Sequence, residues 1–119
     1  MLTIRKEQMA AFARSAVERF EEDLAVSLRD NWPTICARLT EDRLTATIKH
    51  GVARAAFYGI SSENGIFRYL NLMFLLGIDF DIDPKFEWAA SILQDPSLSP
   101  SLKLDLLVRL ARRHVAGDP

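Results

Sequence analysis

Hydrophobic residues recur every three or four positions along much of the chain, which is the spacing of one face of an α-helix. The first such stretch covers residues 4–31. Its apolar stripe is formed by Met9, Ala13, Val17, Phe20, Leu24 and Leu28. Thr3 suits the N-cap of this helix, because its hydroxyl can accept a backbone N–H that a helix start leaves free. Trp32 and Pro33 end the stretch, since proline disfavours the helical conformation in the residue before it. A short helical turn is expected to follow over 33–39.

Two further helices are predicted in the middle of the chain. The first begins at Thr40, a suitable N-cap, and ends at Gly59, which can adopt a left-handed conformation at little cost. It carries small residues that allow a close approach by another helix, at Gly51, Ala53, Ala55 and Ala56. The second covers residues 63–76, is capped by Ser61 or Ser62, and is apolar around nearly its whole circumference. Such a helix is buried, either in the domain centre or in an interface, and the pattern leaves both open.

The segment 78–83 has a different pattern, because apolar and acidic residues alternate there. The sequence reads Ile-Asp-Phe-Asp-Ile-Asp. A period of two indicates an extended run with the apolar residues on one side and the aspartates on the other. No partner strand is evident, so an extended loop is expected.

Two helices complete the chain. Asp83 and Pro84 suit the cap and first turn of a helix that continues to about residue 94, and Ser99 and Pro100 repeat this arrangement for the last helix. The sequence therefore predicts an all-α fold. We expect one domain over residues 1–119, a compact bundle of five or six helices around the apolar helix 63–76.

Length, composition and charge limit the function. The chain has 119 residues, of which 49% are hydrophobic and 26% charged, and a formal net charge of −1. This composition suits a globular domain, and the near-neutral charge provides no global field for nucleic acid or an anionic membrane. Cys36 is the single cysteine, so no intramolecular disulfide is possible. The N-terminal residues carry charges where a signal peptide needs an apolar run, and no apolar stretch reaches the roughly 20 residues that span a bilayer. We expect a cytoplasmic protein.

The acidic residues around the alternating segment are the most conspicuous polar cluster. They are Asp79, Asp81, Asp83 and Glu87. The three aspartates match the first oxygen ligands of an EF-hand calcium loop, but Pro84 and Ala90 stand where that loop needs glycine and glutamate. Calcium is therefore not expected. The cluster is interpreted as a solvated acidic face with Asp83 as a helix cap, or as an acidic contact surface for a basic partner.

The other reactive or charged side chains favour structural roles. His50 and His114 lack neighbours at metal-ligand spacing, and Cys36 is expected to pack as a small hydrophobic residue. Arg68 and Asn71 lie three positions apart on the apolar helix and either reach solvent, satisfy carbonyls or contact a partner. Three arginines near the C-terminus, Arg109, Arg112 and Arg113, are interpreted as ordinary surface. We expect no catalytic residue, no metal and no cofactor.

Residues 57–93 resemble a known group of bacterial proteins. The resemblance rests on the segment 69–84, which reads Tyr-Leu-Asn-Leu-Met-Phe-Leu-Leu-Gly-Ile-Asp-Phe-Asp-Ile-Asp-Pro, followed by Trp88 and Ala89. It is similar to small proteins encoded beside the spike and toxin genes of the type VI secretion system. Ile78 stands where a polar or basic residue is expected, and residues 85–87 depart from the spacing of that group.

The resemblance implies an accessory role without catalysis. The protein would be an adaptor or chaperone that holds a secreted toxin or its spike-tip carrier. Aromatic residues are favoured anchors of such contacts, and acidic residues at the rim tune partner choice. We expect the contact surface on the helix 63–76 and the segment 78–88, with these candidate residues: Arg68, Asn71, Asp79, Phe80, Asp81, Glu87 and Trp88.

Three alternatives stay open. An immunity protein that neutralises a toxin is the neighbouring possibility. A self-associating structural subunit would bury the apolar helix between copies. A homo-oligomer is also compatible with the adaptor role. A small enzyme is the remaining class, although the sequence shows no catalytic constellation.

Overall fold

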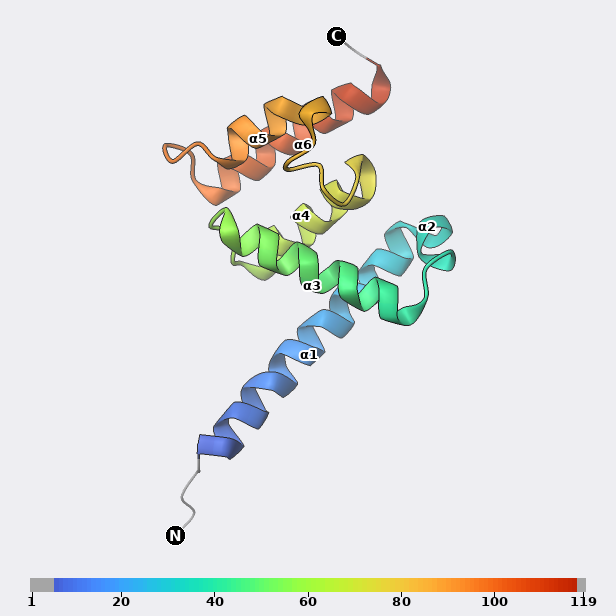
Figure 1. Ribbon diagram of the computed structural model, residues 1–119, viewed down its shortest axis with the longest axis vertical. Coiled ribbons are helices and arrows are strands. Elements are labelled where there is room, and N and C mark those ends of the chain that lie inside the picture. The colour runs from blue at the N-terminus through green and yellow to red at the C-terminus, as the bar shows by residue number, and fades with distance from the viewer. Residues whose placement is uncertain (1–5, 118–119) are drawn as a thin grey trace. The chain divides into compact units, whose positions relative to one another are not determined.

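The computed structural model describes the backbone of residues 6–117 and the side chains of residues 16–117. Over this range the protein is all-α and contains no β-strand (Figure 1). The predicted fold class is confirmed. The predicted cap Thr3 and the side chains of Met9 and Ala13 lie outside the described residues.

Six α-helices and one 3-10 helix follow one another in the described range. They are α1 (Lys6–Asn31), α2 (Pro33–Ala37), α3 (Glu41–Phe57), α4 (Glu63–Leu76), η1 (Pro84–Phe86), α5 (Glu87–Leu93) and α6 (Pro100–Ala116). Pro33 is the first residue of α2, as predicted. The helix predicted from residue 83 begins instead with the 3-10 turn η1, and the α-helical part starts at Glu87.

Side-chain oxygens cap helix starts at the predicted positions. The hydroxyls of Thr40, Ser62 and Ser99 each accept a backbone N–H three residues further on, at 3.1, 3.0 and 3.2 Å. Gly59 follows the end of α3 with a φ of +81°, a conformation that suits glycine. These boundaries are local, because each depends on residues within one helical turn.

The chain divides into two units, Met1–Thr45 and Ala46–Pro119. The boundary falls inside α3, which is continuous across it. No flexible linker separates the units in sequence. The prediction of a single domain over 1–119 stays a prediction.

In the first unit, α2 turns back on the end of α1. The N–H of Trp32 donates to the carbonyl of Leu28 at 2.7 Å, and the N–H of Cys36 donates to the carbonyl of Trp32 at 2.9 Å. Cys36 is buried and its thiol lies 3.6 Å from the carbonyl oxygen of Leu28. Burial raises the pKa of this thiol. The prediction that Cys36 packs as a small hydrophobic residue is confirmed.

In the second unit, α4 provides the core. Tyr69 and Leu70 on this helix are fully buried, and α4 packs against α6, which also packs against α5. The helix 63–76 therefore lies in the core of the second unit. The sequence pattern had left open whether this helix is buried in the core or in an interface. On α6, the buried Lys103 donates from Nζ to the carbonyl of Tyr58 at 3.2 Å. This contact satisfies a carbonyl just beyond the end of α3.

Gly51 lets α3 approach α4 closely. A Cβ atom built at this position would lie 2.2 Å from Cδ2 of Leu70 and 2.8 Å from Sδ of Met73. Such distances are far below ordinary van der Waals contact. The predicted close approach at the small residues of this helix is confirmed at Gly51. Among the described residues, no helix is long and apolar enough to cross a membrane.

Candidate interaction surface

The α4–η1 loop (residues 77–83) does not have the predicted extended conformation. It forms two consecutive turns, in which the N–H of Phe80 donates to the carbonyl of Gly77 and the N–H of Ile82 donates to that of Asp79. A turn changes the direction of successive side chains, so the period of two does not sort them by side. Phe80 and its neighbour Asp81 are both buried, whereas Ile78 and Ile82 are exposed. The prediction of an extended run with separate apolar and acidic sides is wrong.

Asp81 is 1% exposed and joins the loop to α3. Its Oδ2 atom lies 2.8 Å from Nε and 2.7 Å from Nη2 of Arg54. The hydroxyl of Tyr58 donates to the same oxygen at 2.8 Å and accepts from Arg54 Nη2 at 2.9 Å. We call these residues the Arg54 network: Arg54, Tyr58 and Asp81. The prediction that Asp81 lies on a solvated acidic face or a contact rim is wrong, because Arg54 on α3 and Tyr58 just after it hold its buried carboxylate.

The network changes the protonation equilibria of its members. Hydrogen bonding to Asp81 raises the pKa of Arg54, so this guanidinium keeps its charge. Burial, and then the hydrogen bond to Asp81, raise the pKa of Tyr58. Removing the Asp81 carboxylate would leave the partly exposed Arg54 guanidinium and the buried Tyr58 hydroxyl without their shared acceptor, at a cost of about 2–4 kcal/mol. The network therefore fixes the loop on α3.

Phe80 anchors the same loop through its ring. Its centroid lies 5.2 Å from that of the buried Tyr69, in a tilted arrangement. The centroid of the Tyr58 ring lies 6.4 Å from that of Tyr69, so Tyr58, Tyr69 and Phe80 form a small aromatic cluster. The prediction that Phe80 is available to a partner is wrong, because the ring belongs to the core of the second unit.

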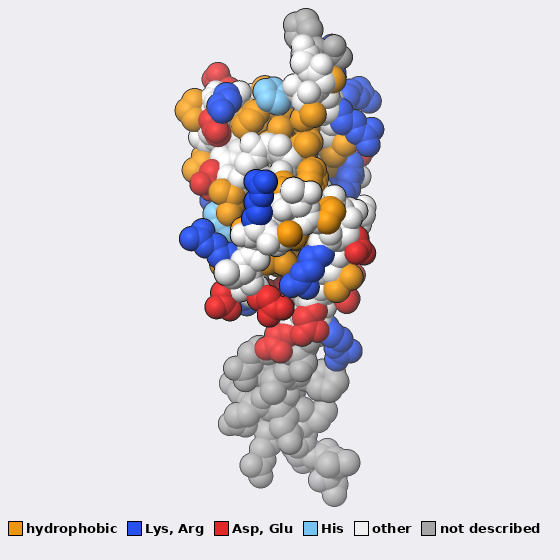
Figure 2. All heavy atoms as spheres, turned by 90° about the vertical axis from the view of Figure 1, so that its right-hand side faces the viewer, with side chains coloured by type: hydrophobic (Ala, Val, Ile, Leu, Met, Phe, Trp, Pro, Cys, Tyr) orange, Lys and Arg blue, Asp and Glu red, His pale blue; other side chains and the backbone are white. Residues whose placement is uncertain are grey.

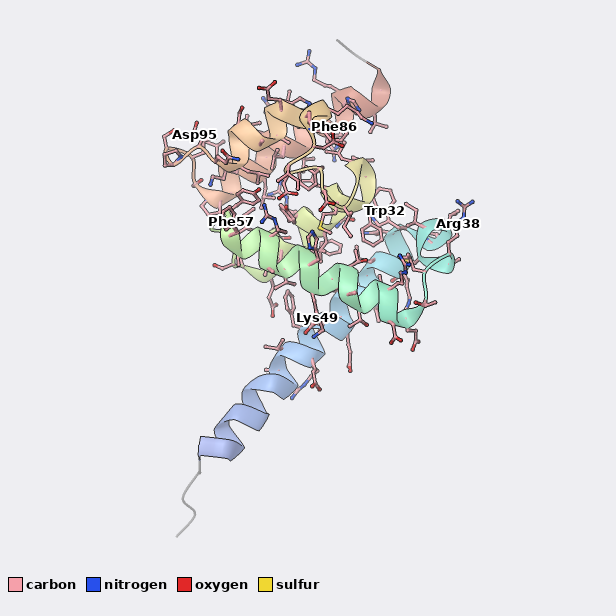
Figure 3. All side chains as sticks on the ribbon, in the orientation of Figure 1. Trp32, Arg38, Lys49, Phe57, Phe86 and Asp95 are labelled. Atoms are coloured by element: carbon pink, nitrogen blue, oxygen red, sulfur yellow. The ribbon has the colours of Figure 1, made fainter. Side chains whose placement is uncertain are left out.

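Three exposed apolar residues are sequence neighbours of the residues that join α3 to the loop. Phe57 is 72% exposed and stands at the end of α3 (Figure 3), and Ile82 is 64% exposed. Ile78 is the third. The guanidinium carbon of Arg54 lies 4.9 Å from the centroid of the Phe57 ring, a cation–π contact. We call these residues the α3–loop surface: Phe57, Ile78 and Ile82.

A second contact joins α3 to the loop. Nε2 of His50 lies 3.4 Å from Oδ1 of Asp79. Asp79 is half exposed, as a rim residue would be, and His50 is partly buried at the edge of the core. His50, Arg54 and Phe57 share one face of α3, since they are four and three positions apart. The candidate surface therefore consists of this face of α3 and the α4–η1 loop.

The remaining predicted site residues lie elsewhere in the second unit. Arg68 donates from Nη2 to Oδ1 of Asp105 at 2.8 Å, and the amide of Asn71 donates to the carbonyl of Phe67 at 2.8 Å. Each side chain thus has a partner within the chain, and their contact with another protein stays a prediction. Glu87 is exposed and Trp88 is half buried. The ring of Trp88 lies edge-on to Phe86 at 6.0 Å, and Phe86 lies edge-on to His114 at 5.1 Å.

A pocket of about 260 Å³ lies where α4 and α6 begin. Ser62 and Ser99 line it, but their hydroxyls already cap the two helices. Arg68, its one cationic side chain, is engaged by Asp105. The pocket thus lacks an unpaired charged group for a ligand.

The carboxylates of the segment 79–87 do not converge. Asp79 faces His50, Asp81 is held by Arg54, and Asp83 caps η1 by accepting the N–H of Lys85 at 2.9 Å. Among the side chains described, residues 16–117, no three metal-ligating side chains come together. No protein family, curated protein or solved structure that we compared matches the chain.

Sequence reasoning missed Arg54, Tyr58 and Phe57. One signal was present, because Arg54 and Tyr58 are four positions apart and place two polar groups on one helix face. The partner of this face is Asp81, 27 positions after Arg54. No local pattern connects the two.

Proposed function

We propose that this protein is a non-enzymatic, cytoplasmic binding protein, an adaptor or chaperone for a type VI secretion toxin or its spike-tip carrier. The observation that supports binding is the exposure of Phe57 and Ile82 beside the buried Arg54 network. Single exposed apolar residues are common on protein surfaces. These differ because both are next to groups that a buried ion pair holds in place.

A rigid support suits a binding surface. Ordering a loop on association opposes binding, so a loop that is already fixed loses less conformational freedom. Arg54 holds Asp81, the residue before Ile82, and its guanidinium also contacts the ring of Phe57. Aromatic residues are frequent anchors at interfaces. The α3–loop surface therefore replaces the predicted contact through Phe80 and Asp81, and Asp79 stays at its rim.

The test co-expresses the chain with a toxin or spike-associated protein of a type VI secretion system. We expect the double variant Phe57→Ala and Ile82→Ala to lose capture of this partner by roughly tenfold or more, the size expected for anchor residues. The matched control is Val115→Ala, since Val115 is 60% exposed and lies at the far end of α6. Far-UV circular dichroism should be unchanged in both variants.

Two outcomes would contradict the proposal. Equal capture by the double variant would show that the α3–loop surface is not used. Failure of the wild-type chain to bind the co-expressed partner would remove the adaptor role itself. Growth of the co-expressing cells distinguishes the alternative, because an immunity protein protects against the toxin and an adaptor need not.

A further inference from the structure

The first unit carries an acidic segment on α1. Residues 18–23 contain four carboxylates and one arginine. Glu18, Glu22 and Asp23 are exposed, and Glu18 and Glu22 lie one turn apart on the same helix face. Among the described side chains, neither Glu18 nor Glu22 has an ion-pair partner. We call residues 18–23 the acidic segment.

The second unit carries the opposite charge on α6. Arg109, Arg112 and Arg113 are exposed and lie on one face, at spacings of three and four. No acidic residue occurs between 106 and 117. None of the three arginines has an ion-pair partner within residues 16–117. Figure 2 shows basic side chains gathered along the upper right edge of the visible face. We call these three residues the arginine face.

The two surfaces are similar in length and opposite in charge. Glu21 has an interaction of its own within the chain, so the acidic segment presents the exposed carboxylates of Glu18, Glu22 and Asp23 beside Arg19, a net charge of −2, and residues 109–113 carry +3 from three arginines. Each places its charges within about one to two helical turns. Arginine binds carboxylates through a planar pair of donors, so a helix with carboxylates one turn apart suits such a face.

We propose that the protein self-associates, with the acidic segment of one copy bound to the arginine face of a second copy. Because every chain carries both surfaces, each copy supplies the partner that the other requires. Nucleic acid fits the arginine face less well, since each chain also presents carboxylates and a net charge of −1. The proposal concerns other residues than the α3–loop surface and does not depend on the proposed function.

The contact is electrostatic and therefore sensitive to salt. Exposed ion pairs are weak individually and are screened beyond about 8 Å at physiological ionic strength. Sedimentation equilibrium should show association at about 20 mM salt, and a decrease of the association constant by roughly tenfold or more at about 300 mM.

Charge reversal gives the decisive test. One variant carries Glu18→Arg and Glu22→Arg, and the other carries Arg109→Glu and Arg112→Glu. We expect each variant alone to be monomeric at low salt, because its two surfaces then repel. Mixed in equal amounts they should associate, because each variant now supplies the charge that the other needs. Glu87→Arg, at another exposed acid, is the control and should associate like the wild-type chain.

Three results would overturn the proposal. They are a monomeric wild-type chain at low salt, association of either reversed variant alone at the wild-type level, and a mixture that stays monomeric. Tight binding of a duplex oligonucleotide by the wild-type chain, lost in the Arg109→Glu and Arg112→Glu variant, would assign the arginine face to nucleic acid instead. Circular dichroism checks that both variants keep their helices.

Discussion

Two arginine–aspartate pairs in the second unit have nearly the same geometry and different surroundings. Arg54 and Asp81 are 2.7 Å apart, and Arg68 and Asp105 are 2.8 Å apart. The side chain of Asp81 is 1% exposed and that of Asp105 is 58% exposed. Water and ions compete for the second pair and are excluded from the carboxylate of the first.

The comparison shows that the distance between the charged atoms does not by itself determine how much an ion pair contributes to stability. Asp81 also accepts a hydrogen bond from the hydroxyl of Tyr58, whereas Asp105 accepts one from Arg68 on α4. The buried carboxylate therefore depends on its partners, and the exposed one retains water as an alternative. The first pair fixes a loop, and the second adds to a helix contact that already exists between α4 and α6.

The largest effect is expected for Asp81→Ala. It removes the shared acceptor of the partly exposed Arg54 guanidinium and the buried Tyr58 hydroxyl, which costs about 2–4 kcal/mol of the free energy of unfolding. Urea denaturation followed by circular dichroism measures this loss. Asp79→Ala, two positions earlier and half exposed, is the control and should cost less than about 1 kcal/mol. Equal losses in the two variants would contradict the burial of Asp81.

An intermediate effect is expected at alkaline pH. The two tyrosines of the chain are Tyr58 and Tyr69, and burial is the main cause that raises the pKa of each. The folded state therefore keeps phenol protons that the unfolded chain releases near pH 10, its ordinary value. Stability is fully present below that pH and is lost as the pH rises above it.

Phenolate absorbance measures this behaviour. Both tyrosines should titrate together with the loss of helical circular dichroism rather than before it. The nearby Asp81 also raises both pKa values, so Asp81→Ala should move the transition to lower pH, and Asp105→Ala should leave it in place. A gradual titration near pH 10 in a chain that stays folded would show that the phenols are exposed.

The smallest effect is expected for the exposed pair. Asp105→Ala should change the free energy of unfolding by less than about 1 kcal/mol, because the pair is screened by solvent. About 1 M sodium chloride should remove this difference between variant and wild type, since the screening length is then about 3 Å. Denaturation of both proteins at low and high salt is the measurement. A loss as large as that of Asp81→Ala would contradict the comparison.

The helices were predictable from sequence because their signals are local. Thr40, Ser62 and Ser99 cap the helices at which they were expected, and Pro33 starts the short second helix. The apolar circumference of 63–76 correctly indicated a buried helix. In each case the determining residues lie within a few positions of one another.

The candidate surface was not predictable because its determinants are distant in sequence. Alternation over 78–83 suggested an extended run, but the fold gives Asp81 a partner on α3 and bends the loop into turns. Once Asp81 and Phe80 turn inward, Ile78 and Ile82 turn outward. Apolar and acidic residues do alternate in this segment, but the contacts of Asp81 and Phe80 with distant residues determine which side chains are exposed to water.

The distribution of rare side chains gives each unit its own natural reporter. The sole thiol, Cys36, is buried in the first unit, and both phenols, Tyr58 and Tyr69, are buried in the second. Thiol labelling and phenol absorbance can therefore follow the opening of each unit without any added probe. Coincident transitions would mean that the whole chain unfolds cooperatively, and separate ones that α3 joins two independently melting parts.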